Sequence, residues 1–127
     1  MGRKAIRLGA VQLQIMRILW QRGSATAREV TQSLAERRLV AHSTVQTLLR
    51  QLESKGAVRH KAAGRTFVYS PTVSEQEVTR RAARELTQRL FGGSPAGLVA
   101  HLIGHETLSR EELERIRALI KRKEQEL

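Results

Sequence analysis

Cysteine and aspartate are both absent from this chain of 127 residues. Without cysteine there can be no disulfide, no thiolate nucleophile and no cysteine-based metal site. Without aspartate there is no Ser-His-Asp arrangement, so we expect no catalytic residue and no enzymatic activity. Aromatic residues make up only 3% of the chain, and no apolar run approaches membrane-spanning length. The basic N-terminus lacks the apolar stretch of a secretory signal, so a cytoplasmic protein without membrane contact is expected.

Positive charge is concentrated in the first part of the chain. Residues 1–73 carry 13 Lys and Arg against three Glu, whereas residues 74–127 carry ten against nine. Nearly all of the net charge of +11 therefore precedes residue 74. Such a charge favours a polyanionic partner, of which nucleic acid is the commonest, although ribosome or membrane-surface binding would also tolerate it. The contrast predicts two domains with two tasks, 1–73 and 74–127.

The stretch from His42 to Gly56 is predicted to be a short helix with two different faces. Its apolar stripe has the helical spacing i, i+3, i+4, i+7 and consists of Val45, Leu48, Leu49 and Leu52. We expect Ser43 to cap the start with Gln46 as its reciprocal partner, and Gly56 to end the helix. The opposite face offers amides, hydroxyls and one guanidinium, which are groups that read base edges. An ordinary surface helix is the alternative interpretation of this face.

Two helices are expected before this stretch. Helical spacing of apolar residues predicts one helix over residues 10–22, ended by Gly23. A second helix is expected after Thr26, with Glu29 completing a capping box, and it should fade by Arg38.

A hairpin is expected after residue 56, because the apolar period changes there to two. Strands are predicted over 57–61 and 66–70, joined by residues 62–65. Three helices followed by a hairpin is the order of a winged helix-turn-helix, so the fold class is mainly α with a small β-hairpin. Lys61 and Arg65 at the hairpin are suited to phosphate contacts. A solvated hairpin with incidental charges is the alternative.

The residues expected to contact DNA therefore come from the outer face of the helix and from the hairpin. Arg50 and Gln46 are expected to contact bases, and the two hairpin cations to contact phosphates. The full set is Ser43, Thr44, Gln46, Thr47, Arg50, Gln51, Lys61 and Arg65.

Three amphipathic segments follow residue 73 and are predicted to form a helical dimerisation domain. Ser74 and Ser109 each stand three residues before a glutamate, which marks two helix starts. The segments are too short and too narrow in apolar width to fold alone, so they need the first domain or a second copy. A second copy is favoured because the first domain looks complete. The expected contacts are Val78, Leu86, Leu90, Leu98, Leu102, Leu113, Ile116 and Ile120.

Several short blocks of sequence follow one another along nearly the whole chain. They are Ile18-Leu19-Trp20, Ser43-Thr44-Val45, Leu52-Glu53-Ser54-Lys55-Gly56, Gly64 to Pro71, Leu90-Phe91-Gly92-Gly93-Ser94, Leu98-Val99 and Leu108 to Leu113. In this order and at these separations they resemble the penicillinase and methicillin-resistance repressors, with their copper-responsive relatives. The resemblance implies a homodimeric repressor that binds a palindromic operator through the winged helix and dimerises through the C-terminal helices.

The signals that release members of that family from DNA have no match in this chain. The resistance repressors are cleaved between an Asn and a Phe after a Leu-Val-type pair, where this chain has His101-Leu102. The copper-responsive relatives use C-terminal cysteines, which are absent here. Resistance repressors often carry basic residues where Ser43 and Gln46 stand, which implies a different operator. The inducing signal and any sensor or protease partner are not identified by the sequence.

Two further functional classes compete with a sequence-specific repressor. A non-specific architectural DNA-binding protein would use the same charge, but it would need Lys and Arg rather than amides on the outer helix face. An enzyme or adaptor could use the C-terminal helices for a protein partner. His101 and His105 have a spacing that could bind zinc, but Gly104 lies between them and no third ligand is evident. We therefore expect neither a metal nor another cofactor.

We predict that β-lactam exposure does not cause cleavage between His101 and Leu102. A pocket built to hydrogen-bond an amide discriminates strongly against a side chain that cannot pair with it. A blot of the native host before and after the drug should show one full-length band. A fragment ending at His101, appearing as operator binding is lost, would contradict this expectation.

Overall fold

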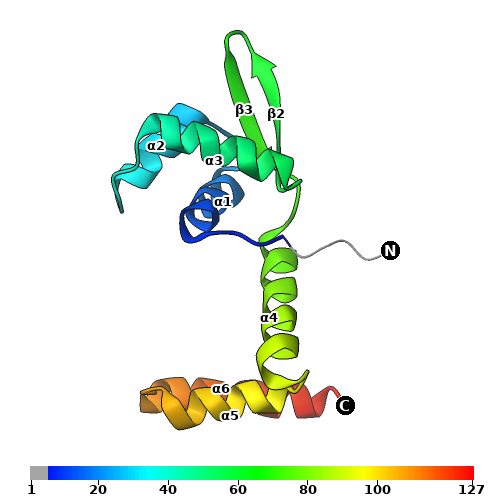
Figure 1. The fold of residues 1–127 in the computed structure, drawn as a ribbon. Helices are drawn as coiled ribbons and strands as arrows, with labels where there is room; N and C mark the ends of the chain where they lie inside the picture. The colour runs from blue at the N-terminus through cyan, green and yellow to red at the C-terminus, as the bar shows by residue number, and fades with distance from the viewer. Residues whose placement is uncertain (1–5) are drawn as a thin grey trace. The chain divides into compact units, whose positions relative to one another are not determined.

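The computed structural model describes residues 6–127, so residues 1–5 of the predicted first domain lie outside the described part. The elements along the chain are α1 (Ala10–Arg22), β1 (Ala25–Thr26), α2 (Ala27–Ala35), α3 (His42–Ser54), β2 (Val58–Ala63), β3 (Thr66–Pro71), α4 (Glu75–Phe91), α5 (Pro95–His105) and α6 (Arg110–Gln125). Figure 1 shows this mainly helical chain and its one small sheet, which confirms the predicted fold class.

The chain separates into two compact units, and the boundary falls within α4, between Glu85 and Leu86. The domain boundary expected between residues 73 and 74 lies just before the same helix. It stays a prediction, because a boundary between functional domains need not coincide with a boundary between packing units.

The sheet has three antiparallel strands in the order β1-β3-β2. The first strand, only two residues long, was not expected, because such a segment has no period of its own. It exists because Ala25 pairs with Tyr69 and Thr26 with Val68. The short strand anchors β3 beside the start of α2.

The hairpin of β2 and β3 extends further than the alternation predicted. Ala62 and Ala63, expected in the connection, continue β2, and Ala63 pairs with Thr66. The turn contains only Gly64 and Arg65, and Gly64 has a φ of 65°, which glycine adopts without a Cβ penalty. Figure 1 shows the hairpin projecting beyond α1, α2 and α3.

The core of the first unit is built from one apolar face of each helix and from the bases of the strands. The expected stripe of α3 is buried at Val45, Leu49 and Leu52, and Leu48 lies at its edge. The other buried hydrophobic residues are Ile15, Met16, Leu19, Ala25, Val30, Leu34, Ala57, Val58 and Tyr69. This unit therefore has a complete hydrophobic core within a single chain.

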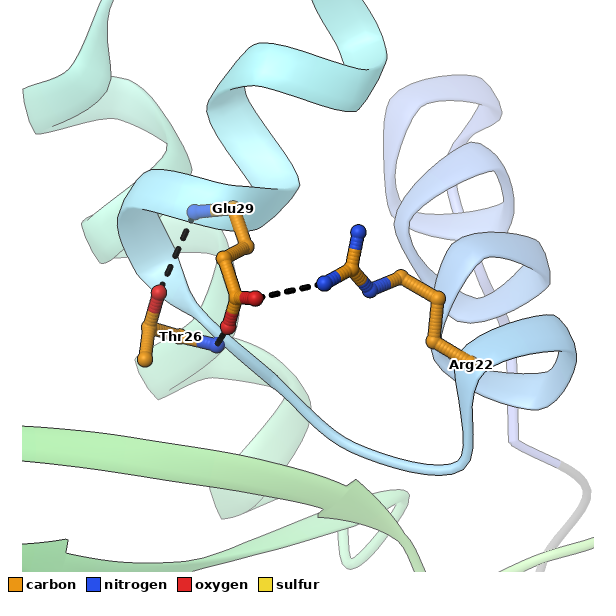
Figure 2. Close-up of polar contacts among 3 residues, drawn as sticks. All are labelled: Arg22, Thr26 and Glu29. Carbon is orange, nitrogen blue, oxygen red and sulfur yellow. Dashed lines mark hydrogen bonds and ion pairs between the residues drawn. The ribbon is translucent and has the colours of Figure 1, made fainter.

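The start of α2 carries the predicted capping box (Figure 2). The Thr26 hydroxyl accepts a hydrogen bond from the Glu29 backbone N–H at 3.1 Å, and the Glu29 carboxylate accepts from the Thr26 N–H at 2.9 Å. Arg22, in the last turn of α1, donates to the other carboxylate oxygen at 2.5 Å. The backbone and side-chain hydrogen bonds with Thr26 lower the pKa of Glu29. Burial opposes them with a smaller effect, and the charge of Arg22 lowers the pKa by the least.

The start of α3 differs from the prediction. The helix begins at His42 with Ala41 at the N-cap, and no side chain caps it. The expected Ser43 cap is wrong, because the helix starts earlier and Ser43 lies inside its first turn. The end agrees with the prediction: Gly56 has a φ of 80°, and the N–H groups of Gly56 and Ala57 donate to the carbonyls of Glu53 and Leu52.

The last three helices start at serine caps. Ser74 and Ser109 accept hydrogen bonds from the backbone N–H groups of Glu77 and Glu112, each at 3.0 Å, as the sequence predicted. Ser94 caps α5 in the same way, which was not predicted. No residue of α4, α5 or α6 is buried. No helix between residues 6 and 127 is both long enough and apolar enough to span a membrane.

We predict that Glu29→Gln destabilises the protein at neutral pH more than at acidic pH. Because the folded-state pKa lies below the ordinary value of 4.5, the ionised carboxylate contributes stability above that value, and this contribution is lost as the pH falls through the folded-state pKa. Urea unfolding at several pH values should show the difference in free energy of unfolding shrinking toward acid. Thr26→Ser, which keeps the hydroxyl, should retain the wild-type pH dependence. A difference between Glu29→Gln and wild type that is constant with pH would refute this account.

Candidate nucleic-acid interface

The outer face of α3 is exposed at every position that the sequence predicted. Burial of the apolar stripe turns the opposite side of the helix to solvent, because helical side chains repeat about every 3.6 residues. The predicted residues exposed there are Ser43, Thr44, Gln46, Thr47, Arg50 and Gln51. The structure thus places all six on one accessible surface.

Two hydrogen bonds connect the polar side chains along this face. The Thr47 hydroxyl donates to the Ser43 carbonyl at 3.1 Å, and the Arg50 guanidinium donates to the Thr47 hydroxyl at 3.4 Å. A guanidinium has five N–H donors, so Arg50 keeps further donors for a partner. These bonds hold Arg50 along the helix surface.

A groove of about 560 Å³ is lined by the start of α2, the outer face of α3 and the hairpin. Arg28, Arg50 and Arg65 bring positive charge to it from three different elements, and Gln46 and His42 add polar groups. Base-reading and phosphate-binding chemistry are thereby combined in one concave surface.

His60 lines this groove and connects the hairpin to α3. Its Nδ1 lies 2.8 Å from both carboxylate oxygens of Glu53, and its ring stacks on Phe67 at a centroid distance of 4.2 Å. Burial, followed by the charge of Glu53, raises the pKa of the neighbouring Tyr69 hydroxyl, and Arg50 opposes this shift. The contact between His60 and Glu53 therefore attaches the hairpin to the helix that it flanks, and the stacking on Phe67 holds the His60 ring within the hairpin.

The structure separates the two cations that the sequence grouped at the hairpin. Arg65 occupies the turn and lines the groove. Lys61 pairs with Val68, one position from the His60–Tyr69 pair, so its side chain leaves the opposite face of the ribbon. Arg65 and Arg50 thus share a surface, whereas Lys61 is exposed on the other face of the hairpin.

Sequence reasoning missed three residues that contribute to this surface. Arg28 and His42 line the groove, and His60 braces it. Arg28 follows the Thr26 cap by two residues, so the sequence could have placed this cation in the first turn of α2. For His42 and His60 no sequence signal existed, because their positions depend on how α3 and the hairpin pack together.

Gln51 differs from the other predicted contacts because it has an internal partner. Its Oε1 accepts a hydrogen bond of 3.1 Å from Nε2 of Gln12 on α1. One end of this amide is therefore engaged by the protein, although the side chain is exposed.

The residues predicted to form a dimer are mostly exposed apolar side chains. Leu86, Leu90, Leu102, Leu113 and Ile120 are between 38% and 65% exposed, and Leu98 and Ile116 are half-buried. Val99, Ile103 and Leu119 add exposed apolar area that the prediction did not include. Leaving so many large apolar side chains in water is unfavourable, and such patches mark interaction surfaces.

Val78 differs from the rest of that set. It lines a cavity of about 540 Å³ together with Ile6, Val58 and Val73, all within the first unit. Its assignment to the dimer interface stays a prediction, and the structure gives it a partner surface within its own unit.

His101 and His105 stack their rings at a centroid distance of 4.4 Å on α5. His105 Nδ1 donates to the His101 carbonyl at 3.0 Å, and the His101 ring also lies 5.8 Å from that of Phe91. Over the described range 6–127, no three ligating side chains gather as a metal site would require. A third ligand for this histidine pair would have to come from elsewhere.

Comparisons with known proteins place this geometry among DNA-binding repressors. A family model described as "Penicillinase repressor" matches residues 8–122. The penicillinase repressor of Bacillus licheniformis is 28% identical over 111 residues, which cover 87% of this chain and 87% of that protein. The methicillin resistance regulatory protein MecI of Mammaliicoccus sciuri is 24% identical and covers 97% of this chain and 100% of that protein. A solved structure of monomeric Bacillus licheniformis BlaI with the blaP half-operator is 32% identical, with a TM-score of 0.50 over 58% of this chain and 90% of that one.

Proposed function

We propose that this chain, which belongs to the penicillinase repressor family, binds a palindromic operator as a homodimer and represses transcription. The observation that carries the proposal is the exposed face of α3, where amide, hydroxyl and guanidinium groups adjoin a groove lined by three arginines. The similarity to a repressor solved with its half-operator supports the same kind of ligand. The proposal requires no catalytic step, and operator binding would place the protein in the cytoplasm.

In this proposal α3 enters the major groove and the hairpin lies along the adjacent backbone. Arg50 and Gln46 are the expected base contacts, because arginine pairs with guanine and glutamine with adenine. Arg65 and Arg28, at the two sides of the groove, are the expected phosphate contacts. The chemistry of this face favours specific binding over the architectural alternative, since backbone-only binding relies chiefly on Lys and Arg, whereas Gln and Arg on a helix in the major groove read base edges.

The C-terminal helices are proposed to hold two copies together. Their apolar side chains have no buried position within one chain, and a second copy supplies an identical apolar surface to cover them. A two-fold dimer presents two copies of α3, which explains why a palindromic operator is the expected target.

We predict that Arg50→Ala and Arg65→Ala weaken DNA binding in different ways. Arg50→Ala should cost roughly 1–3 kcal/mol on the selected operator and relax its specificity, because a base contact is lost. Arg65→Ala should weaken specific and random DNA alike and reduce the salt slope by about one, because a phosphate contact is lost. Titrations of selected and random duplexes at several salt concentrations separate the two effects. If Arg50→Ala weakens both duplexes equally, its assigned role in base reading is incorrect.

We predict that Leu102→Glu converts the dimer to a monomer. A buried carboxylate without a partner strongly disfavours an apolar interface. Operator affinity should fall by about 100-fold or more, because the second half-site loses its effective concentration. Sedimentation should show the change in mass, with Leu39→Glu as the matched control, since Leu39 is 95% exposed and lies in the first unit. A Leu102→Glu protein that still sediments as a dimer would exclude α5 from the interface.

A further inference from the structure

The one buried polar or charged side chain among the described residues is Gln12, which is 7% exposed at the start of α1. Its Oε1 accepts hydrogen bonds from the Gly9 backbone N–H at 3.0 Å and from the Lys55 ammonium at 2.9 Å. Its Nε2 donates to Oε1 of Gln51 at 3.1 Å. Both ends of the Gln12 amide are therefore used, and one of them contacts the DNA-facing side of α3.

The direction of this chain of hydrogen bonds is set by the groups at its inner end. A backbone N–H and an ammonium can only donate, so the Gln12 atom that faces them must be the oxygen. The Gln12 nitrogen then faces Gln51, and only an oxygen of Gln51 can accept from it. The nitrogen of the Gln51 amide is consequently the end left for a partner.

We propose that Gln12 is a specificity-determining residue that acts through Gln51, so that Gln51 presents only N–H donors to DNA. This inference rests on the proposed operator binding. A glutamine that reads adenine through two hydrogen bonds must donate and accept at once. The Gln51 oxygen keeps a second lone pair, but its hydrogen bond from Gln12 holds it toward α1 and away from a partner on DNA. Gln51 therefore pairs with an acceptor on DNA: adenine or guanine N7, guanine O6, thymine O4, or a phosphate oxygen.

The surroundings of Gln51 fit an acceptor as its partner. Gln51 shares a shallow depression on α3 with Arg50 and Lys55, and with the hydroxyl residues Thr47 and Ser54. Both charged groups are cations, so this part of the surface attracts the electron-rich atoms of DNA. An outward-pointing amide oxygen would be repelled by those same atoms.

Gln12→Glu is the variant that tests the direction of these hydrogen bonds. A glutamate at this position can still accept from Gly9 and Lys55, so the start of α1 is preserved. Its second oxygen cannot donate, so Gln51 must turn its nitrogen inward and its oxygen toward DNA. The substitution thus reverses the hydrogen-bonding character of a side chain on another helix.

The DNA readout is a double-mutant cycle that joins Gln12→Glu with Gln51→Ala. With Gln51 present, Gln12→Glu should weaken operator binding by about three- to tenfold more than it does in the Gln51→Ala background. Gln21→Glu, which adds the same charge at the other end of α1, should show no coupling to Gln51→Ala. Equal losses from Gln12→Glu in both backgrounds would overturn the proposal.

Duplexes with single base-pair changes identify the acceptor. If Gln51 contacts a base, the coupling should depend on one operator position, where Gln12→Glu shifts the preference toward a donor such as adenine N6 or cytosine N4. If it contacts a phosphate, the coupling should be equal for all duplexes. Both patterns agree with an outward donor. If wild type binds a duplex with cytosine at that position more tightly than Gln12→Glu does, the proposal is overturned, because cytosine offers only the N4 donor in the major groove.

A measurement without DNA separates this inference from the proposed function. In the free protein, NMR should show the side-chain NH₂ protons of Gln12 protected from solvent exchange and those of Gln51 exchanging rapidly. In Gln12→Glu, the Gln51 protons should become protected. The opposite pattern in the wild type would overturn the proposal even if operator binding is found. Failure to select an operator would refute the proposed function and with it the role of Gln12 in specificity, whereas the exchange pattern would still decide which end of the Gln51 amide faces outward.

Discussion

The packing of α3 is the constraint on which the rest of the first unit depends. Val45, Leu49 and Leu52 are fully buried against residues of α1 and α2. Once this stripe is buried, the helical period leaves no choice about which residues face outward. A rotation of α3 that hid its polar face would expose the three apolar side chains, at a cost of about 1.5–3 kcal/mol for each. The polar face of α3 is thus exposed because the opposite face of the same helix is buried in the hydrophobic core.

The hairpin and α1 each make a polar contact with α3 that affects the chemistry of its exposed face. His60 connects β2 to Glu53 on α3, which fixes the distance between the hairpin and the helix. Gln12 connects α1 to Gln51 on the same helix. Each connection uses a polar side chain that does not itself belong to the predicted DNA-binding set. The chemistry of the surface is therefore partly decided by residues behind it and beside it.

The two compact units differ in how many of their apolar side chains are buried within a single chain. The first has its own buried core, including the fully buried Ile15 and Leu19. The last three helices bury no side chain, and large residues such as Leu90 and Ile103 stay in contact with water. Their capping serines define where the helices start, but caps contribute only about 1 kcal/mol each and cannot replace a core. The contrast in burial matches the contrast in charge between the two parts of the chain.

The sequence by itself determined the features that depend on local spacing. The helix ended by Gly23, the box of Thr26 and Glu29, the stripe of α3 and the left-handed Gly56 could all be predicted. These features depend on residues a few positions apart, whose interactions the backbone geometry fixes.

Only the tertiary structure decided features that join distant segments. The strand β1 exists because β3 lies beside it. Lys61 is separated from Arg65 because the register of the hairpin turns Lys61 away from the groove that Arg65 lines. The partner of Gln51 is 39 residues away, so no local pattern could reveal which end of its amide faces outward. Periodicity specifies which side of an element is buried, whereas the identity of the groups that meet across the core depends on packing in three dimensions.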